Sequence, residues 1–377
     1  MKDPRVETVA KILVDYSVEV RPNQLVMISG APEGAPLILA VYQKVLERGA
    51  NPFLWVGQQG IEWTMFGLEG AEELLYAYAS EAQLDYVPPF MSDIIEQIDA
   101  SISIWADVNT RHFTKADPAK QSRRAVAMRP LDNRFTERAA KKELRWTLTL
   151  YPTQAFAQDA EMSLREFEDF VYNGCLVHEP DPISAWRIVS EEQQRIVDWL
   201  NKARQIHIVG PDTDLKLEVT GRKWGNCDGH GNFPDGEIYT GPIEDSVNGY
   251  IRYTYPTCNF GREVEDIQLQ FKDGKVIKAT AAKNEQFLLK MLETDEGSRY
   301  VGEFAFGTNS GIQGYTKNIL LDEKIGGTIH LALGEGYPES GSKNKSAIHW
   351  DMLCDLRDGG EVRVDGTLFL KDGKILI

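Results

Sequence analysis

The first half of the chain alternates between two hydrophobic periodicities. Residues 6–20 carry apolar side chains at the three- and four-residue spacing of an amphipathic helix, and the run LVMISG at residues 25–30 is typical of a buried strand. Further helices are predicted at residues 36–48, 71–82 and 91–98, and further strands at residues 52–56, 100–106 and 145–153. Because strands that alternate with helices usually pair in parallel, we predict an α/β domain whose parallel sheet is flanked by helices.

The second half is rich in predicted strands. Two helical runs, residues 163–172 and 182–203, precede it. Asp-Gly pairs stand between alternating apolar residues in FKDGKV, RVDGTL and LKDGKI, and each predicts a β-hairpin because both turn residues must adopt a positive φ. We predict two domains, an N-terminal α/β domain at residues 1–185 and a C-terminal, mainly antiparallel β domain of the α+β class at residues 186–377, with one helix near residues 284–293.

The composition excludes several classes of partner. The 377 residues include 41 Lys and Arg against 57 Asp and Glu, a formal net charge of −16. Nucleic acids and anionic membranes are bound by basic surfaces, so we expect neither as a partner. No stretch approaches the roughly 18 consecutive apolar residues of a membrane span. The cysteines are scattered and form no CxxC pair, which favours a reducing compartment and a cytoplasmic location.

The sequence gives little support for nucleotide binding or for a serine nucleophile. The turn ISGAPEGAP at residues 28–36 matches neither GxGxxG nor GxxxxGK[ST], and a tight strand-to-helix turn of a parallel sheet accounts for it better. The chain has no GxSxG motif, which disfavours a serine nucleophile.

Two residues near the C-terminus point to a metal ion. His349 and Asp351 stand two apart in SAIHWDMLCDLR. On an extended strand, residues i and i+2 project from the same face, so this imidazole and this carboxylate can bind one cation. The pair alone does not distinguish a metal site from ordinary surface residues.

Three further segments supply metal-binding side chains. Glu237 follows a turn in NFPDGEIYTGP that presents its carboxylate, and His330 closes the β-branched run GGTIH. Glu303 lies between apolar residues in VGEFAFGTN, where a carboxylate is costly to desolvate unless a cation compensates it. Two glutamates, two histidines and one aspartate suit two divalent ions with one bridging carboxylate. Mixed nitrogen and oxygen donors favour Zn²⁺ or Co²⁺, with Mg²⁺ and Mn²⁺ as alternatives.

The remaining histidines have simpler explanations. His112 and His178 have the surroundings of surface or loop residues, and His207, in QIHIVG, is predicted to be a hydrogen-bonded core residue. His230 lies close to Glu237 in the sequence, and we favour a loop role for it over metal binding. A structural metal site is disfavoured because such sites are closed and rich in cysteine, whereas this set is rich in carboxylates.

Four ordered motifs resemble one known family. The stretches PDGEIYTGP, VGEFAFGTN, LLDEKIGGTIHLALGEGYPESG and SAIHWDMLCDLR resemble the thermophilic-type metallo-aminopeptidases, the family of aminopeptidase T and aminopeptidase S. Their order and approximate spacing match, and SGAPEGAPLILAVYQKVLERGANP resembles that family's first domain. The resemblance therefore spans nearly the whole chain.

The resemblance implies roles for individual residues. Glu323, in LLDEK, matches an acidic position near the metals, as a ligand or one step removed, although its spacing to His330 differs from that in some members. Tyr337, in GEGYP, matches an active-site tyrosine. The family further implies a homodimer that removes N-terminal residues from short peptides. The metal ligands that it implies are Glu237, Glu303, His330, His349 and Asp351, with Glu303 at the centre as ligand and general base.

We therefore predict a metal-dependent aminopeptidase with two divalent ions per subunit. A water molecule acidified by the metals would attack the first peptide bond, with Glu303 as proton acceptor and Tyr337 near the oxyanion. Two alternatives stay open. One is a di-metal amidohydrolase or esterase that acts on a non-peptide substrate, and the other is a non-catalytic metal-binding protein.

Overall fold

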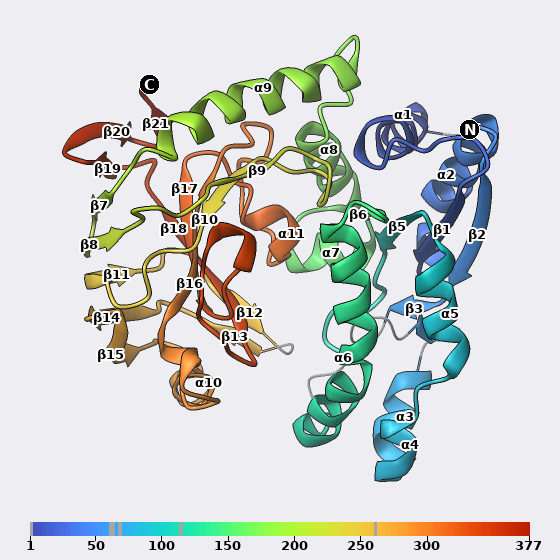
Figure 1. Ribbon diagram of the computed structural model, residues 1–377, viewed down its shortest axis with the longest axis horizontal. Coiled ribbons are helices and arrows are strands. Elements are labelled where there is room, and N and C mark those ends of the chain that lie inside the picture. Colours follow the sequence, from blue (N-terminus) through green and yellow to red (C-terminus); the bar gives the residue numbers. More distant parts are fainter. Residues whose placement is uncertain (1–2, 60–64, 67–69, 113–115, 260–261) are drawn as a thin grey trace. The chain divides into compact units, whose positions relative to one another are not determined.

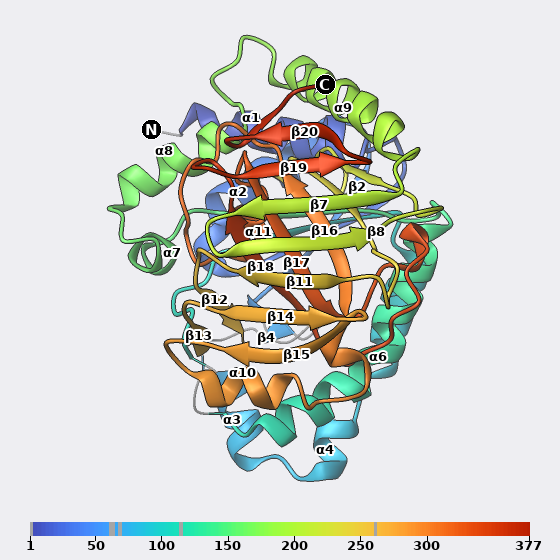
Figure 2. The same ribbon diagram turned by 90° about the vertical axis from the view of Figure 1, so that its left-hand side faces the viewer.

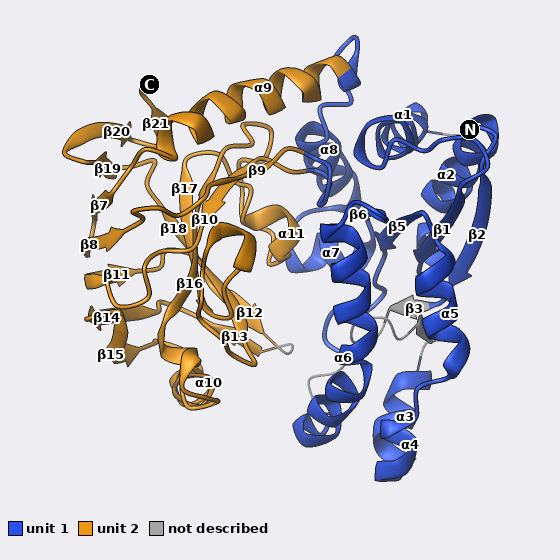
Figure 3. Cartoon of the chain, viewed as in Figure 1, with its two compact units in different colours: residues 1–183, 229–234 blue, residues 184–228, 235–377 orange. Residues whose placement is uncertain are grey.

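The computed structural model describes residues 3–59, 65–66, 70–112, 116–259 and 262–377 (Figure 1). The chain divides into two compact units (Figure 3). Met1–Ile183 and Gly229–Pro234 make up the first unit, and Ser184–Asp228 and Asp235–Ile377 make up the second. Among the described helices, none combines the length and the apolar character that a membrane crossing requires.

The first unit is built on a parallel sheet, which over the described residues has four strands in the order β2-β1-β5-β6. Val26 pairs with Pro52 on one side and with Ala100 on the other, in parallel register on both sides. The strands are β1 (Leu25–Gly30), β2 (Asn51–Val56), β5 (Ala100–Trp105) and β6 (Arg145–Leu150). The predicted parallel α/β architecture of this half is thus confirmed, although β6 ends at Leu150, before Pro152.

Helices accompany this sheet and differ from the prediction at several places. The α-helix predicted at residues 6–20 ends at Ile12, where a π-helix (Leu13–Ser17) begins, and the short helix Gln154–Asp159 was not predicted. The helix predicted at residues 71–82 is divided in two, because Ser80 caps a new helix by accepting a hydrogen bond from the backbone of Gln83. A 23-residue helix that contains Pro130 was not predicted, because its polar sequence lacks a clear apolar stripe. The helices are α1 (Pro4–Ile12), α2 (Ala35–Glu47), α3 (Ala71–Tyr78), α4 (Glu81–Asp85), α5 (Pro89–Gln97), α6 (Pro118–Ala140), α7 (Gln154–Asp159) and α8 (Leu164–Gly174), and two short strands, β3 (Gln58–Gln59) and β4 (Met65–Phe66), pair with each other.

The second unit contains two large antiparallel sheets among its described residues (Figure 2). The eight-stranded sheet has the order β15-β14-β11-β8-β7-β19-β20-β21, and the five-stranded sheet has the order β18-β17-β16-β10-β9. The predicted antiparallel β architecture is confirmed.

The elements of the second unit have the following bounds. The eight-stranded sheet consists of β7 (Gln205–Gly210), β8 (Thr213–Glu218), β11 (Asn248–Arg252), β14 (Gln268–Lys272), β15 (Lys275–Thr280), β19 (Glu361–Val364), β20 (Thr367–Lys371) and β21 (Lys374–Ile375). The five-stranded sheet consists of β9 (Gly225–Cys227), β10 (Glu237–Thr240), β16 (Val301–Gly307), β17 (Thr328–Gly334) and β18 (His349–Asp355). The other elements are α9 (Pro182–Leu200), α10 (Glu285–Met291), α11 (Ile319–Asp322) and the pair β12 (Thr257–Asn259) and β13 (Arg262–Val264).

The Asp-Gly pairs form the hairpin turns that the sequence predicted. Asp273 and Gly274, between β14 and β15, have φ angles of 48° and 79°. The corresponding pairs that join β19 to β20 and β20 to β21 also have positive φ at both residues. These turns connect neighbouring strands of the eight-stranded sheet over short loops.

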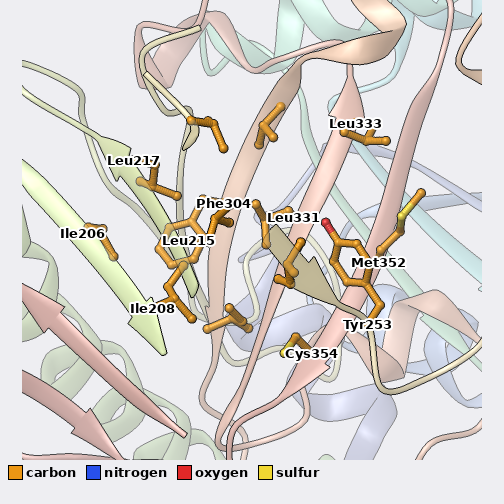
Figure 4. Packing of buried hydrophobic residues seen from close by; sticks show 14 of the residues in the cluster. Ile206, Ile208, Leu215, Leu217, Tyr253, Phe304, Leu331, Leu333, Met352 and Cys354 are labelled. Carbon is orange, nitrogen blue, oxygen red and sulfur yellow. The ribbon is translucent and has the colours of Figure 1, made fainter. Parts of the chain in front are cut away.

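The two sheets share one hydrophobic core (Figure 4). Ile206 and Leu215 of the eight-stranded sheet and Phe304, Leu331 and Met352 of the five-stranded sheet belong to it. Along β8, buried and exposed residues alternate, so one face of that sheet meets the core and the other meets solvent. Strands β16 and β17 are instead buried at every position. Their face away from the core is therefore also enclosed, and this face carries the candidate site.

Candidate metal centre

The predicted metal ligands lie on the enclosed face of the five-stranded sheet. Side chains alternate along a strand, so the neighbours of core residues point away from the core. The ligands adjoin core residues in this way: Glu237 is next to Ile238, Glu303 is next to Phe304, His330 is next to Leu331, and His349 and Asp351 stand on either side of Trp350. The alternation that makes the core hydrophobic thus directs these polar side chains to the opposite face.

The register of the strands brings the ligands to one place. Glu303 of β16 and Asp351 of β18 both pair with Ala332 of β17, from its two sides. His330 pairs with Ala305 of β16. Because Ala332 and Ala305 end in a methyl group, the space above the middle of the sheet is left to the longer acidic and imidazole side chains.

The ligand atoms form overlapping groups of three. Among the described residues, Glu237, Glu303 and His330 make one such group, and Glu303, His349 and Asp351 make another, each with its ligand atoms within 4.8 Å of one another. Glu303 belongs to both: its Oε1 lies 4.0 Å from Nε2 of His330, and its Oε2 lies 3.2 Å from Nε2 of His349. Nε2 of His330 also lies 3.6 Å from Oε1 of Glu237. Glu323, with His330 and Asp351, completes a third group, so all six predicted ligands lie in this cluster.

Burial determines the acidity of two of these carboxyl groups. Desolvation raises the pKa of Glu303 to about 8, although its hydrogen bond with His349 acts in the opposite direction. Desolvation also raises the pKa of Glu323 above its ordinary value, against the lowering effect of Lys324. Both carboxylates are therefore costly to hold as isolated anions, and a cation beside them would relieve that cost.

The other members of the cluster are dominated by their charged neighbours. Burial opposes the charged form of Glu237, but Lys324 and His330 outweigh it and hold its pKa below the ordinary value. Burial also opposes charge on the imidazoles, yet Glu237 raises the pKa of His330 to about 9, and Asp351 and Glu303 raise that of His349 to about 10. The carboxylates thus favour a cation at each imidazole, and a divalent metal ion competes there with the proton.

The hydrogen bonds of the two histidines test whether the cluster fits a metal ion. His330 is fully buried, and neither of its ring nitrogens has a hydrogen-bond partner among the residues that the structure describes. Buried polar atoms nearly always have a partner, so these nitrogens call for one. His349 is held differently: its Nδ1 lies 2.8 Å from the backbone oxygen of Glu335, which leaves Nε2 facing Glu303. A second contact of this kind orients most metal-binding histidines. The donor set therefore fits a divalent cation.

Two charged residues of this site were not predicted from the sequence. Lys324 is 1% exposed, and its Nζ contacts Glu237 closely and lies 2.7 Å from Oε1 of Glu323 and 3.5 Å from Oδ1 of Asp235. Asp235 is buried as well. Both residues stand inside the motifs PDGEIYTGP and LLDEK, next to predicted ligands, and that adjacency is the signal that the sequence offers for them.

Tyr337 lies at the edge of the cluster. It follows β17 and is 39% exposed. Its ring centroid is 5.2 Å from that of His349 and 5.3 Å from that of Tyr239. The phenol is therefore close to one imidazole of the cluster while it remains accessible from outside.

The remaining histidines lie outside these ligand groups. His112 is partly exposed, His178 is exposed, and His230 is an exposed loop residue of the first unit whose ring lies 4.4 Å from that of Tyr16. His207 differs from its prediction, because it is on the more exposed face of β7 instead of in the core. Its Nε2 nevertheless has a polar partner, Oδ1 of Asp214 at 2.8 Å.

Comparison with known proteins places the chain. The sequence pattern of the thermophilic metalloprotease family (M29) matches residues 2–375. Aminopeptidase 2 of Geobacillus stearothermophilus is 28% identical over 411 residues, which cover 97% of this chain and 94% of that protein. The structure of wild-type AmpT from Thermus thermophilus has a TM-score of 0.85 and 22% identity and covers 99% of both chains.

A further solved structure shares the fold but has a different name. It is 2,5-dihydroxypyridine dioxygenase from Pseudomonas putida KT2440, with a TM-score of 0.58 and 14% identity over 99% of this chain and 96% of that chain. The fold alone therefore does not decide the chemistry. The family pattern is the stronger criterion and spans the chain almost from end to end. The family predicted from the four motifs is thus confirmed, and the chain belongs to the thermophilic metalloproteases of family M29.

Proposed function

We propose that this chain is a metal-dependent aminopeptidase that removes N-terminal residues from short peptides with two divalent cations, Zn²⁺ or Co²⁺. The observation that carries the proposal is the position of Glu303, whose two carboxylate oxygens face two different histidines. A carboxylate shared by two ligand groups is what a bridging ligand requires. The metalloprotease family supports the peptide bond as the target, and the relative named Aminopeptidase 2 supports the N-terminal bond.

The two ligand groups assign residues to each cation. Glu237, Glu303 and His330 would hold one ion, and Glu303, His349 and Asp351 would hold the other, with Glu323 beside His330 and Asp351. When bound, the ions supply Lewis-acid polarisation of the scissile carbonyl and lower the pKa of a coordinated water molecule. The free α-amino group of a peptide, in its neutral form, would be a further ligand for one of the ions.

The protein's own groups then move protons and stabilise charge. In this proposal the carboxylate of Glu303 takes the proton of the attacking water and returns it to the leaving amine, with Glu323 as the neighbouring carboxylate. The phenol of Tyr337 donates a hydrogen bond to the oxygen that becomes negative in the tetrahedral intermediate. Its position, 5.2 Å from the His349 ring between centroids and partly open to solvent, supports this assignment.

The proposal is tested with matched substrates and defined metal content. The protein is stripped with a chelator, reloaded with Zn²⁺ or Co²⁺, and assayed with leucyl-p-nitroanilide and with its N-acetylated form. We expect turnover of the free-amine substrate after reloading, no turnover after stripping, and little turnover of the acetylated substrate. Activity that survives complete stripping would contradict the metal mechanism. Equal turnover of the acetylated substrate, or turnover of simple amides and esters only, would instead support an amidohydrolase or esterase.

The assembly is part of the same proposal. The resemblance of the motifs supports a homodimer, and the scattered cysteines support a cytoplasmic location; both stay predictions. Light scattering coupled to gel filtration measures the mass of the particle directly. A mass of twice the subunit is expected, and a monomer that has full peptidase activity would contradict the dimer.

A further inference from the structure

Lys324 is a buried cation inside a cluster of metal-binding carboxylates. It lies just beyond α11 and is 1% exposed. Its Nζ contacts carboxylate oxygens of three residues, Glu237, Glu323 and Asp235. An ammonium group has three protons to donate, so these carboxylates can satisfy it fully. Lys324 therefore carries its charge within the cluster itself and not toward solvent.

The contacts of Lys324 are distributed unevenly over the ligand groups. The group of Glu237, Glu303 and His330 contains one partner of Lys324, and the group of Glu323, His330 and Asp351 contains another. The group of Glu303, His349 and Asp351 contains none. A further group, Cys227, Asp235 and Glu237, contains two partners of Lys324, and no group that contains a partner of Lys324 includes His349. The positive charge is thus on the His330 side of Glu303 and not on the His349 side.

The balance of charges in the cluster indicates the role of Lys324. Five carboxylates lie in it or against it, those of Asp235, Glu237, Glu303, Glu323 and Asp351. Their negative charges equal the combined charge of two divalent cations and one ammonium. Lys324 supplies part of that compensation on one side only, and like charges repel strongly where water is largely excluded. A cation near His330 therefore meets both a weaker attraction and a direct competitor for Glu237.

We propose that Lys324 makes the two cation positions unequal, so that the position at Glu303, His349 and Asp351 fills first and the position at Glu237, Glu303 and His330 binds its ion more weakly and exchanges it. This inference rests on the proposal that the cluster binds divalent metal ions. In addition, Lys324 lowers the affinity of the protein for the second ion. The activity of the protein would then follow the free metal concentration over the range in which the His330 position fills.

Stepwise metal binding tests the inference. Chelator-stripped full-length protein is titrated with Zn²⁺ by calorimetry in the presence of a competing chelator, which yields the number of ions and each dissociation constant. Lys324→Met keeps the length of the side chain and removes the charge, and Lys324→Arg keeps the charge. Lys283→Met is the matched control, because Lys283 also bridges two carboxylates, Glu263 and Glu265, neither of which belongs to a ligand group.

The expected result is two separated binding steps in the unsubstituted protein. In Lys324→Met the weaker step should become tighter by about 10-fold or more, while the tighter step changes little. Lys324→Arg and Lys283→Met should keep the original separation. One bound ion in the unsubstituted protein and two in Lys324→Met would support the inference equally. Two equal steps in the unsubstituted protein, or a weaker step that is unchanged or loosened in Lys324→Met, would overturn it.

Two provisions keep the experiment decisive. If Lys324→Met does not fold, as judged by circular dichroism, Lys324→Met combined with Asp235→Asn removes one of the three carboxylates that the substitution leaves without the ammonium group, and it is the one that is not a predicted ligand. The binding steps need no substrate. If the metal-loaded protein shows the predicted binding steps but hydrolyses no peptide, the proposed function is contradicted and the inference about Lys324 still holds. Protein that binds no divalent ion would remove both.

Discussion

Nε2 of His349 lies 3.2 Å from Oε2 of Glu303, while the other oxygen of the same carboxylate faces His330 at 4.0 Å. Glu303 is 3% exposed and lies on a strand whose next residue, Phe304, belongs to the core. The side chain therefore has little freedom to leave this position. A bridging role for Glu303 follows from this geometry, and its substitution should affect both cation positions together.

Glu303→Gln should abolish most of the activity without unfolding the protein. The amide keeps the size of the carboxyl group but removes its charge and its ability to accept the proton of water. We expect kcat/KM to fall by about 10²–10⁴-fold and the number of bound metal ions to fall below two. Glu361→Gln, a partly exposed carboxylate paired with Lys371, is the control and should behave like the unsubstituted protein. Near-normal turnover by Glu303→Gln would remove Glu303 from the site.

Ala332→Val should disturb the site while sparing the fold. Ala332 pairs with both Glu303 and Asp351, and the added methyl groups would occupy the space between these carboxylates. We expect a loss of metal binding that is visible by calorimetry, with a cost in unfolding free energy of about 1–3 kcal/mol. Metal binding that matches the unsubstituted protein would show that the space above Ala332 is not used.

Leu331→Ala tests the opposite face of the same strand. Leu331 is fully buried in the core, so its truncation should reduce the free energy of unfolding by about 2–5 kcal/mol in denaturant titrations. Because its side chain points away from the ligands, the affinity of the folded protein for Zn²⁺ should change little. A loss of metal binding as large as that of Ala332→Val would contradict the division of β17 into a core face and a site face.

The fold was predictable from the sequence to the extent that it depends on local patterns. The Asp-Gly turns and the alternation of apolar and polar residues are local sequence patterns, so the antiparallel architecture could be predicted from them. Helix α6 was not predicted, because its polar sequence has no apolar stripe. The association of Gly229–Pro234 with the first unit depends on a bridge between Leu148 and Asn232, which no local pattern indicates.

The candidate ligands of the site could be named from the sequence, but Lys324 could not. Glu303 and His330 stand in strand-like runs where a polar residue is unusual, and Glu237 follows a turn that presents its carboxylate, so each can be identified from its neighbours in the sequence. Lys324 stands among polar residues and has the sequence surroundings of a solvated side chain. In the folded chain its ammonium group contacts Glu237, which is 87 residues away in the sequence. Only the tertiary structure reveals that contact.

Tyr337→Phe should lower the rate of the chemical step without changing metal binding. The substitution removes one hydroxyl group and retains the ring that lies beside His349 and Tyr239. If the phenol stabilises the oxyanion, kcat should fall by about 100-fold while KM changes little. Stopped assays with leucyl-p-nitroanilide measure both constants, and calorimetry with Zn²⁺ checks the ions. A kcat within about twofold of the original would exclude the hydroxyl group from catalysis.

Acid should weaken an ion-pair network whose carboxylates belong to none of the ligand groups, and one substitution tests this. Lys283 bridges Glu263 and Glu265, and its hydrogen bond to Glu263 lowers the pKa of that carboxyl from 4.5 to about 2. A carboxyl whose pKa is lower in the folded state contributes stability above its unfolded pKa and loses it as the pH falls through the folded value. In Lys283→Met the pKa of Glu263 should return toward 4.5. The difference in unfolding free energy between the two proteins should therefore be constant above about pH 5 and shrink between about pH 4.5 and pH 2. Denaturant titrations across this range measure it, and a difference that grows toward low pH would contradict the assigned network.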